Sequence, residues 1–101
     1  MPRMEGFTMK VIKRNGEEVP FDLSKIVNAV KAANLEVEPI HRLNEYQIQA
    51  VADTVEKKLE SLPHITHVED VQDMVEIGIM EMRGYEVAQK YVRYRYKREL
   101  A

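Results

Sequence analysis

The sequence predicts an α+β fold in which a four-helix bundle is capped by a small sheet, a β-hairpin extended to three strands. An Asn15-Gly16 pair separates two short extended segments near the start of the chain. Later segments carry apolar residues at helical spacing between capping and helix-stopping residues. With 101 residues and a hydrophobic fraction of 45%, the chain is large enough for one domain with a modest core.

The hairpin is predicted from Met9–Lys13 and Glu18–Phe21, after a flexible lead-in over residues 1–8. Asn-Gly favours a two-residue type I′ turn, because both residues tolerate a positive φ. Pro20 has no backbone N–H, so it restricts the second strand to an edge of the sheet.

The first helix is predicted over Leu23–Ala33, with Asp22 as its N-cap and Asn34 as its end. A loop follows over Glu36–Arg42. The second helix is predicted over Glu45–Ser61.

The limits of the second helix rest on its flanking residues. Asn44 and Gln47 have the spacing of a capping box, and Pro63 cannot continue the helix. Ile65 and its neighbours are expected to form a short third strand.

The third helix is predicted to begin after Val68, with Gly84 as its C′ residue, the position that commonly adopts a left-handed conformation and ends a helix. Gly78 inside this helix indicates a close helix approach or a bound ligand. The fourth helix is predicted over Tyr85–Glu99, and it carries at helical spacing Val87, Ala88, Tyr91, Tyr94 and Arg98.

Composition limits the classes of function. The net charge of −2 gives no overall basic field for DNA or RNA, so any anion site must be local. The absence of cysteine excludes a disulfide framework and fits the reducing cytoplasm. No apolar run reaches the roughly 18 residues of a membrane span. We therefore expect a cytoplasmic protein without a membrane or nucleic-acid partner.

The junction between hairpin and first helix is the strongest candidate for a binding site. Lys13 and Arg14 precede the turn, and Lys25 lies in the first turn of the helix that Asp22 begins. Backbone donors, the helix dipole and ammonium groups converge there, which suits a polyphosphate. The alternative, an ordinary surface hairpin with solvated cations, is about equally compatible with the residues alone.

Other residue clusters point to no further chemistry. Tyrosines and basic residues crowd the last helix, which an amphipathic helix with half-buried tyrosines explains, although Lys97 is retained as a phosphate-binding candidate. His64 and His67 have no obvious third metal ligand. The only serines, Ser24 and Ser61, have no evident base partner, so no catalytic or metal residue is predicted.

Two stretches of the sequence resemble a known family. VIKRNGEEVPFDLSKI, Val11 to Ile26, resembles the opening of the ATP-cone, the allosteric domain at the N-terminus of many ribonucleotide reductases. VEDVQDMVEIGIMEMRGYEVAQKYVRYR, Val68 to Arg95, resembles the rest of that domain and is most similar to the anaerobic reductases. The resemblance implies an ATP-cone over residues 9–99.

The resemblance also implies a ligand and its contacts. ATP or dATP would lie beneath the hairpin, with Mg²⁺ assisting at the phosphates. The residues carried over are Lys13, Arg14, Lys25 and Lys97 for the phosphates, Asp22 for the nucleoside, Val11 and Ile26 for the base pocket, and Gln72 as a polar residue facing the nucleotide.

The resemblance implies a regulatory domain without catalysis of its own, in which ATP favours an active reductase and dATP an inhibited one. Its partners would be adenine nucleotides and either the reductase catalytic domain or other cones. One alternative is the cone of a nucleotide-sensing transcriptional regulator. Such regulators carry a cysteine zinc ribbon in front of the cone, so the absence of cysteine counts against this alternative. Another is a helical protein-interaction module that binds no nucleotide.

Overall fold

The computed structural model describes residues 9–100, with side chains over 9–97. The predicted lead-in over 1–8 and the side chain of Arg98 lie outside the described residues. In chain order the elements are β1 (Lys10–Ile12), β2 (Glu18–Pro20), α1 (Leu23–Leu35), the short 3₁₀ helix η1 (Pro39–His41), α2 (Glu45–Ser61), β3 (Thr66–His67), α3 (Val68–Glu81) and α4 (Tyr85–Leu100). The predicted α+β class, four helices with a three-stranded sheet, is confirmed.

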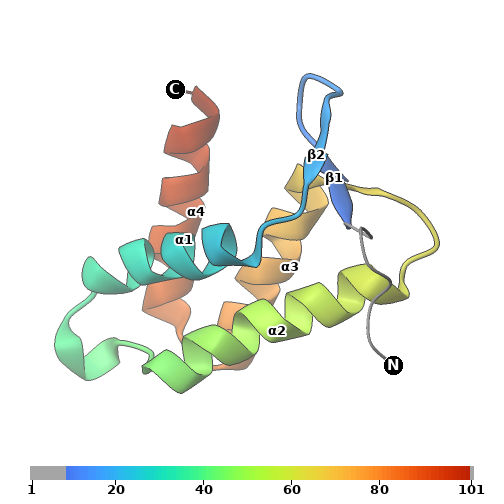
Figure 1. Cartoon of the computed structure of the whole chain (residues 1–101). Helices are drawn as coiled ribbons and strands as arrows, with labels where there is room; N and C mark the ends of the chain where they lie inside the picture. Colours follow the sequence, from blue (N-terminus) through green and yellow to red (C-terminus); the bar gives the residue numbers. More distant parts are fainter. Residues whose placement is uncertain (1–8, 101) are drawn as a thin grey trace.

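The sheet stands at one end of the bundle, and the connection between α1 and α2 lies at the other end (Figure 1). Its strand order is β2-β1-β3, with β1 antiparallel to β2 and parallel to β3. Val11 in the central strand pairs with Val19 on one side and with Thr66 on the other. Because β3 runs directly into α3, this pairing fixes the hairpin against the start of α3.

The hairpin turn differs from the predicted type I′ turn. Only Gly16 has a positive φ, of 88°, and Asn15 does not. Lys13 and Glu17 close a three-residue loop, with the Lys13 N–H donating to the Glu17 carbonyl at 2.8 Å and the Gly16 N–H to the Lys13 carbonyl at 2.9 Å. This pattern is that of a type I turn followed by a left-handed glycine, which explains why one positive φ suffices.

The predicted starts of the first two helices are confirmed. The Asp22 side chain accepts from the Ser24 N–H at 3.0 Å, which makes it the N-cap of α1. Asn44 and Gln47 form the predicted capping box, each side chain accepting from the other residue's backbone N–H at 2.8 Å. These local bonds fix where α1 and α2 begin, and α2 has the predicted limits.

The prediction that Asn34 ends the first helix is wrong, because α1 continues to Leu35. The Asn34 side chain is buried and pairs with the backbone of Leu43, donating to its carbonyl at 3.0 Å and accepting from its N–H at 2.9 Å. A tertiary contact therefore satisfies an amide that sequence reasoning assigned to a helix end. This pair holds the loop between α1 and α2 against the bundle.

The prediction that Gly84 ends the third helix by a left-handed conformation is also wrong. Arg83 adopts that conformation, with φ of 62°. The Arg83 N–H donates to the Met80 carbonyl at 2.8 Å and the Gly84 N–H to the Ile79 carbonyl at 3.1 Å, which is a Schellman motif. Gly84 is needed for space, since a Cβ there would lie 3.0 Å from Leu43 Cδ2.

The core lies between the four helices and the underside of the sheet. Its most buried large side chains are Val30, Val51, Val55, Val75, Ile79 and Val87. Gly78 allows α2 and α3 to approach closely, because a Cβ there would lie 3.1 Å from Val51 Cγ1. Of the two predicted reasons for this glycine, the structure therefore shows the close helix approach.

Candidate functional site

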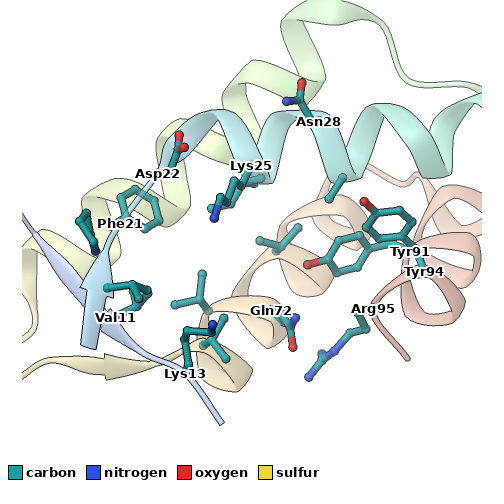
Figure 2. Close-up of a pocket in the computed structure, with 17 residues that line it drawn as sticks. Val11, Lys13, Phe21, Asp22, Lys25, Asn28, Gln72, Tyr91, Tyr94 and Arg95 are labelled. Atoms are coloured by element: carbon teal, nitrogen blue, oxygen red, sulfur yellow. The ribbon is translucent and has the colours of Figure 1, made fainter. Parts of the chain in front are cut away.

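A cavity of about 510 Å³ opens beneath the hairpin, between α1, α3 and α4 (Figure 2). The sheet and the N-terminal turns of α1 form one side, and α3 with the later part of α4 forms the other. Six of the predicted binding residues line it: Val11, Lys13, Asp22, Lys25, Ile26 and Gln72. The fold thus brings predicted binding residues from β1, α1 and α3 to one space.

Two lysines supply positive charge to the cavity. Lys13 directly follows β1, and Lys25 lies in the first turn of α1, where its own N–H donates to the Asp22 carbonyl at 3.1 Å. The Lys13 ammonium lies 3.7 Å from Glu17 Oε1, but half of its side chain is exposed. Such a pair contributes little to stability, so the ammonium remains available to an anion.

Asp22 combines a structural role with a place in the lining. Its Oδ1 accepts from the Ser24 hydroxyl at 2.6 Å and from the Ser24 N–H at 3.0 Å. These hydrogen bonds to Ser24 lower the pKa of Asp22 below its ordinary value, with a smaller contribution from the Lys25 charge. The carboxylate is therefore an acceptor for ligand donors at neutral pH.

Apolar side chains form the wall nearest the sheet. Val11 and Ile26 are buried, and Phe21 is half-buried beside them. Val71 and Val75 of α3 add further apolar surface to the lining. A flat heteroaromatic ring fits such a surface, because small-molecule sites pair apolar walls with a few placed polar groups.

Gln72 places an unused acceptor in the cavity lining. Its Oε1 is buried and has no hydrogen-bond partner among the described residues. A buried acceptor without a partner costs free energy, typically about 1–3 kcal/mol. A ligand that donates a hydrogen bond to this oxygen would recover that cost.

The far end of the cavity is built from residues that were not predicted as ligands. They are Asn28 of α1 and the α4 residues Tyr91, Tyr94 and Arg95 (Figure 2). Tyr91 is buried, and its burial raises the pKa of its hydroxyl to about 12. The recurrence of Tyr91, Tyr94 and Arg95 on one face of α4 was visible in the sequence, but its meaning depends on how α4 packs against α1 and α3.

Arg14 and Lys97 do not line the cavity. The Arg14 Nε lies 3.5 Å from Glu69 Oε1 at the start of α3, which ties the hairpin turn to that helix. Lys97 is exposed near the end of α4.

In the part of the chain that the structure describes, no helix is long and apolar enough to cross a membrane.

Comparison with known proteins identifies the family of this chain. Residues 9–100 match the ATP cone domain. The anaerobic ribonucleoside-triphosphate reductase of Haemophilus influenzae is 34% identical over 92 residues, which cover 90% of this chain and 13% of the reductase. The chain therefore spans a small part of that relative. On the match over residues 9–100, the chain belongs to the ATP cone domain family.

Proposed function

We propose that this domain binds ATP and dATP in the cavity beneath the hairpin and thereby regulates a ribonucleotide reductase. The observation that carries the proposal is that Lys13 and Lys25 line the same cavity, which also has an apolar wall. The ammonium groups would hold the phosphates, and the wall near Val11 and Ile26 would receive the base. Mg²⁺ would enter with the nucleotide, as it commonly does at phosphates.

Regulation requires that ATP and dATP stabilise different states. A ligand with equal affinity for two conformations or assemblies shifts neither. The hairpin is coupled to α3 through the Val11–Thr66 pairing and the ion pair between Arg14 and Glu69. A nucleotide that moves the hairpin would therefore move the start of α3, and the reductase or another cone would respond to that change.

The domain itself carries no proposed catalytic role. Its relative is a reductase, but the matched region is 13% of that protein. The proposal assigns the chemistry to the remainder of such an enzyme and the nucleotide sensing to this domain.

Calorimetric titration with ATP, dATP, GTP and inorganic tripolyphosphate tests the binding. Tight binding of both adenine nucleotides, with weaker binding of GTP and tripolyphosphate, is the expected result. Equal affinity for all four would identify a simple polyanion surface, as a helical interaction module predicts.

Sedimentation with saturating ATP and then dATP tests the regulatory part. We expect the domain to change its association between the two nucleotides. Of the tyrosines on α4, Tyr96 is exposed and is a candidate for such a contact, whereas Tyr91 belongs to the core. The same monomeric boundary in both conditions would place the switching surface outside this domain.

A further inference from the structure

Arg95 lines the nucleotide cavity and is also held by the acidic edge of α3. One terminal nitrogen, Nη1, lies 2.7 Å from Asp73 Oδ1 and 3.5 Å from Glu76 Oε1. The other, Nη2, donates to the Glu69 carbonyl at 3.4 Å. The Arg95 side chain is 16% exposed, whereas that of Asp73 is 60% exposed. The guanidinium is thus poised between solvent-facing carboxylates and the cavity.

The hairpin contributes a second guanidinium to the same edge. Arg14 pairs with the Glu69 carboxylate, so the side chains of Glu69, Asp73 and Glu76 engage both arginines that flank the cavity. These acids recur on one side of α3 at helical spacing. Carboxylates and phosphates both match the planar fork of a guanidinium, so they compete for it.

We propose that the carboxylates of Asp73 and Glu76 bind the Arg95 guanidinium in the empty protein, and that a bound polyphosphate displaces them. Arg95 then binds the phosphates directly, and its departure from the two carboxylates breaks an ion-pair contact between α3 and α4. Figure 2 shows Lys13, Gln72 and Arg95 around one side of the cavity, so a chain of phosphates held by Lys13 would have Arg95 within its reach on that side. The inference rests on the proposed function and adds the device by which binding reaches α4.

The exchange has a thermodynamic consequence that a purely structural ion pair lacks. A weaker ion pair between Asp73 and Arg95 must raise the affinity for polyphosphate, because less interaction free energy is then lost when the polyphosphate displaces the carboxylate. By the same linkage, a bound polyphosphate weakens the contact between α3 and α4. If the ion pair stays intact on binding, removing its carboxylate gives only the general gain expected from one negative charge fewer near a polyanion.

Calorimetric titration of ATP and AMP into the full chain and its variants tests the exchange. Asp73→Asn should bind ATP about two- to fivefold more tightly, the range for an ion pair with one exposed partner. AMP should gain less, because its single phosphate leaves less negative charge for Arg95. Asp70→Asn is the matched control, since Asp70 is an exposed carboxylate of the same helix outside the lining.

Arg95→Gln supplies the second half of the test. It should weaken ATP binding and should abolish the gain when combined with Asp73→Asn. An unchanged or weaker ATP affinity in Asp73→Asn, or a gain that survives in the double variant, would overturn the exchange. Wild-type protein that binds no ATP would overturn the proposed function as well, which separates the two failures.

A readout on the wild-type chain does not depend on the variants folding. The ¹⁵N-resolved signal of the Arg95 side-chain Nε–H should shift when ATP is added, and to a lesser extent with AMP. Among the variants, Glu76→Gln should raise the ATP affinity less than Asp73→Asn does, because the Glu76 carboxylate lies farther from Arg95 than the Asp73 carboxylate. An Arg95 signal that is insensitive to saturating ATP would contradict the exchange.

Discussion

Lys13 and Lys25 face one cavity from two elements that meet only because the hairpin turns back over the start of α1. Lys25 lies where the helix dipole is positive, so its charge is unfavourable in the absence of an anion. The cap from Asp22 relieves part of that cost, since its carboxylate interacts favourably with the Lys25 charge. The pair of lysines is therefore the place to begin testing the site.

Replacing either lysine by alanine should weaken ATP binding by ~1.5–3 kcal/mol, the range for hydrogen bonds to charged groups. The melting temperature of the nucleotide-free protein should hardly change, because exposed ion pairs such as Lys13–Glu17 contribute little. Calorimetry and thermal unfolding measure the two effects. Lys31→Ala, an exposed lysine of α1 outside the lining, is the control. Unchanged affinity in both test variants would refute the phosphate assignment.

Gln72→Leu should separate binding from stability. Removing an acceptor that has no partner removes its desolvation cost, so the empty protein should be as stable as wild type or more stable by up to about 1 kcal/mol. ATP affinity should fall, because the ligand loses an acceptor. Gln89→Leu, at an exposed position of α4, controls for the change in side-chain type. A Gln72→Leu variant with normal ATP affinity would show that this oxygen does not contact the nucleotide.

Tyr91 should make the folded state sensitive to alkaline pH. Its pKa is raised from 10.0 to about 12, so the folded state holds the proton more tightly than the unfolded state does. This contribution is fully present below pH 10 and is lost as the pH rises toward 12. Tyr91→Phe should flatten the loss of stability in that window, as followed by denaturant unfolding between pH 9 and 12. Parallel curves for the two proteins would contradict the assignment.

Gly78→Ala should destabilise the domain although alanine is the better helix former. The added methyl would meet buried Val51 at 3.1 Å, and a β-branched side chain in the core cannot turn aside easily. Overpacking should exceed the propensity gain, for a net loss of about 1 kcal/mol. In a Val51→Ala background the same change should be neutral or stabilising, and a double-mutant cycle of unfolding free energies measures this coupling. Additive effects would mean that the helices do not meet at this point.

Local signals in the sequence predicted the fold where local bonds decide it. The capping box at Asn44 and the proline at position 63 gave the correct limits of α2, and Asp22 gave the correct start of α1. The errors lie where a tertiary contact prevails. Asn34 stays helical because Leu43 satisfies its amide, and Gly84 is required by packing against Leu43 while Arg83 takes the left-handed conformation.

The candidate site divides in the same way. The hairpin and the start of α1 are continuous in sequence, so the charges around Lys13, Asp22 and Lys25 were visible as one motif. The far end, with Asn28, Tyr91 and Arg95, was not predicted. It depends on the packing of α4 against α1 and α3, which no short motif encodes.

The pairing of β1 with β3 has a consequence for how this domain folds. Val11 pairs with Thr66, although the whole of α1 and α2 lies between these two residues in the chain. Closing so long a loop is slow compared with forming helices, so we expect the bundle to assemble first and the parallel strand pair to form last. The sheet beside the cavity would then be the last part of the domain to form during synthesis. A nascent chain would gain the cavity beneath the hairpin only after α3 had joined the bundle.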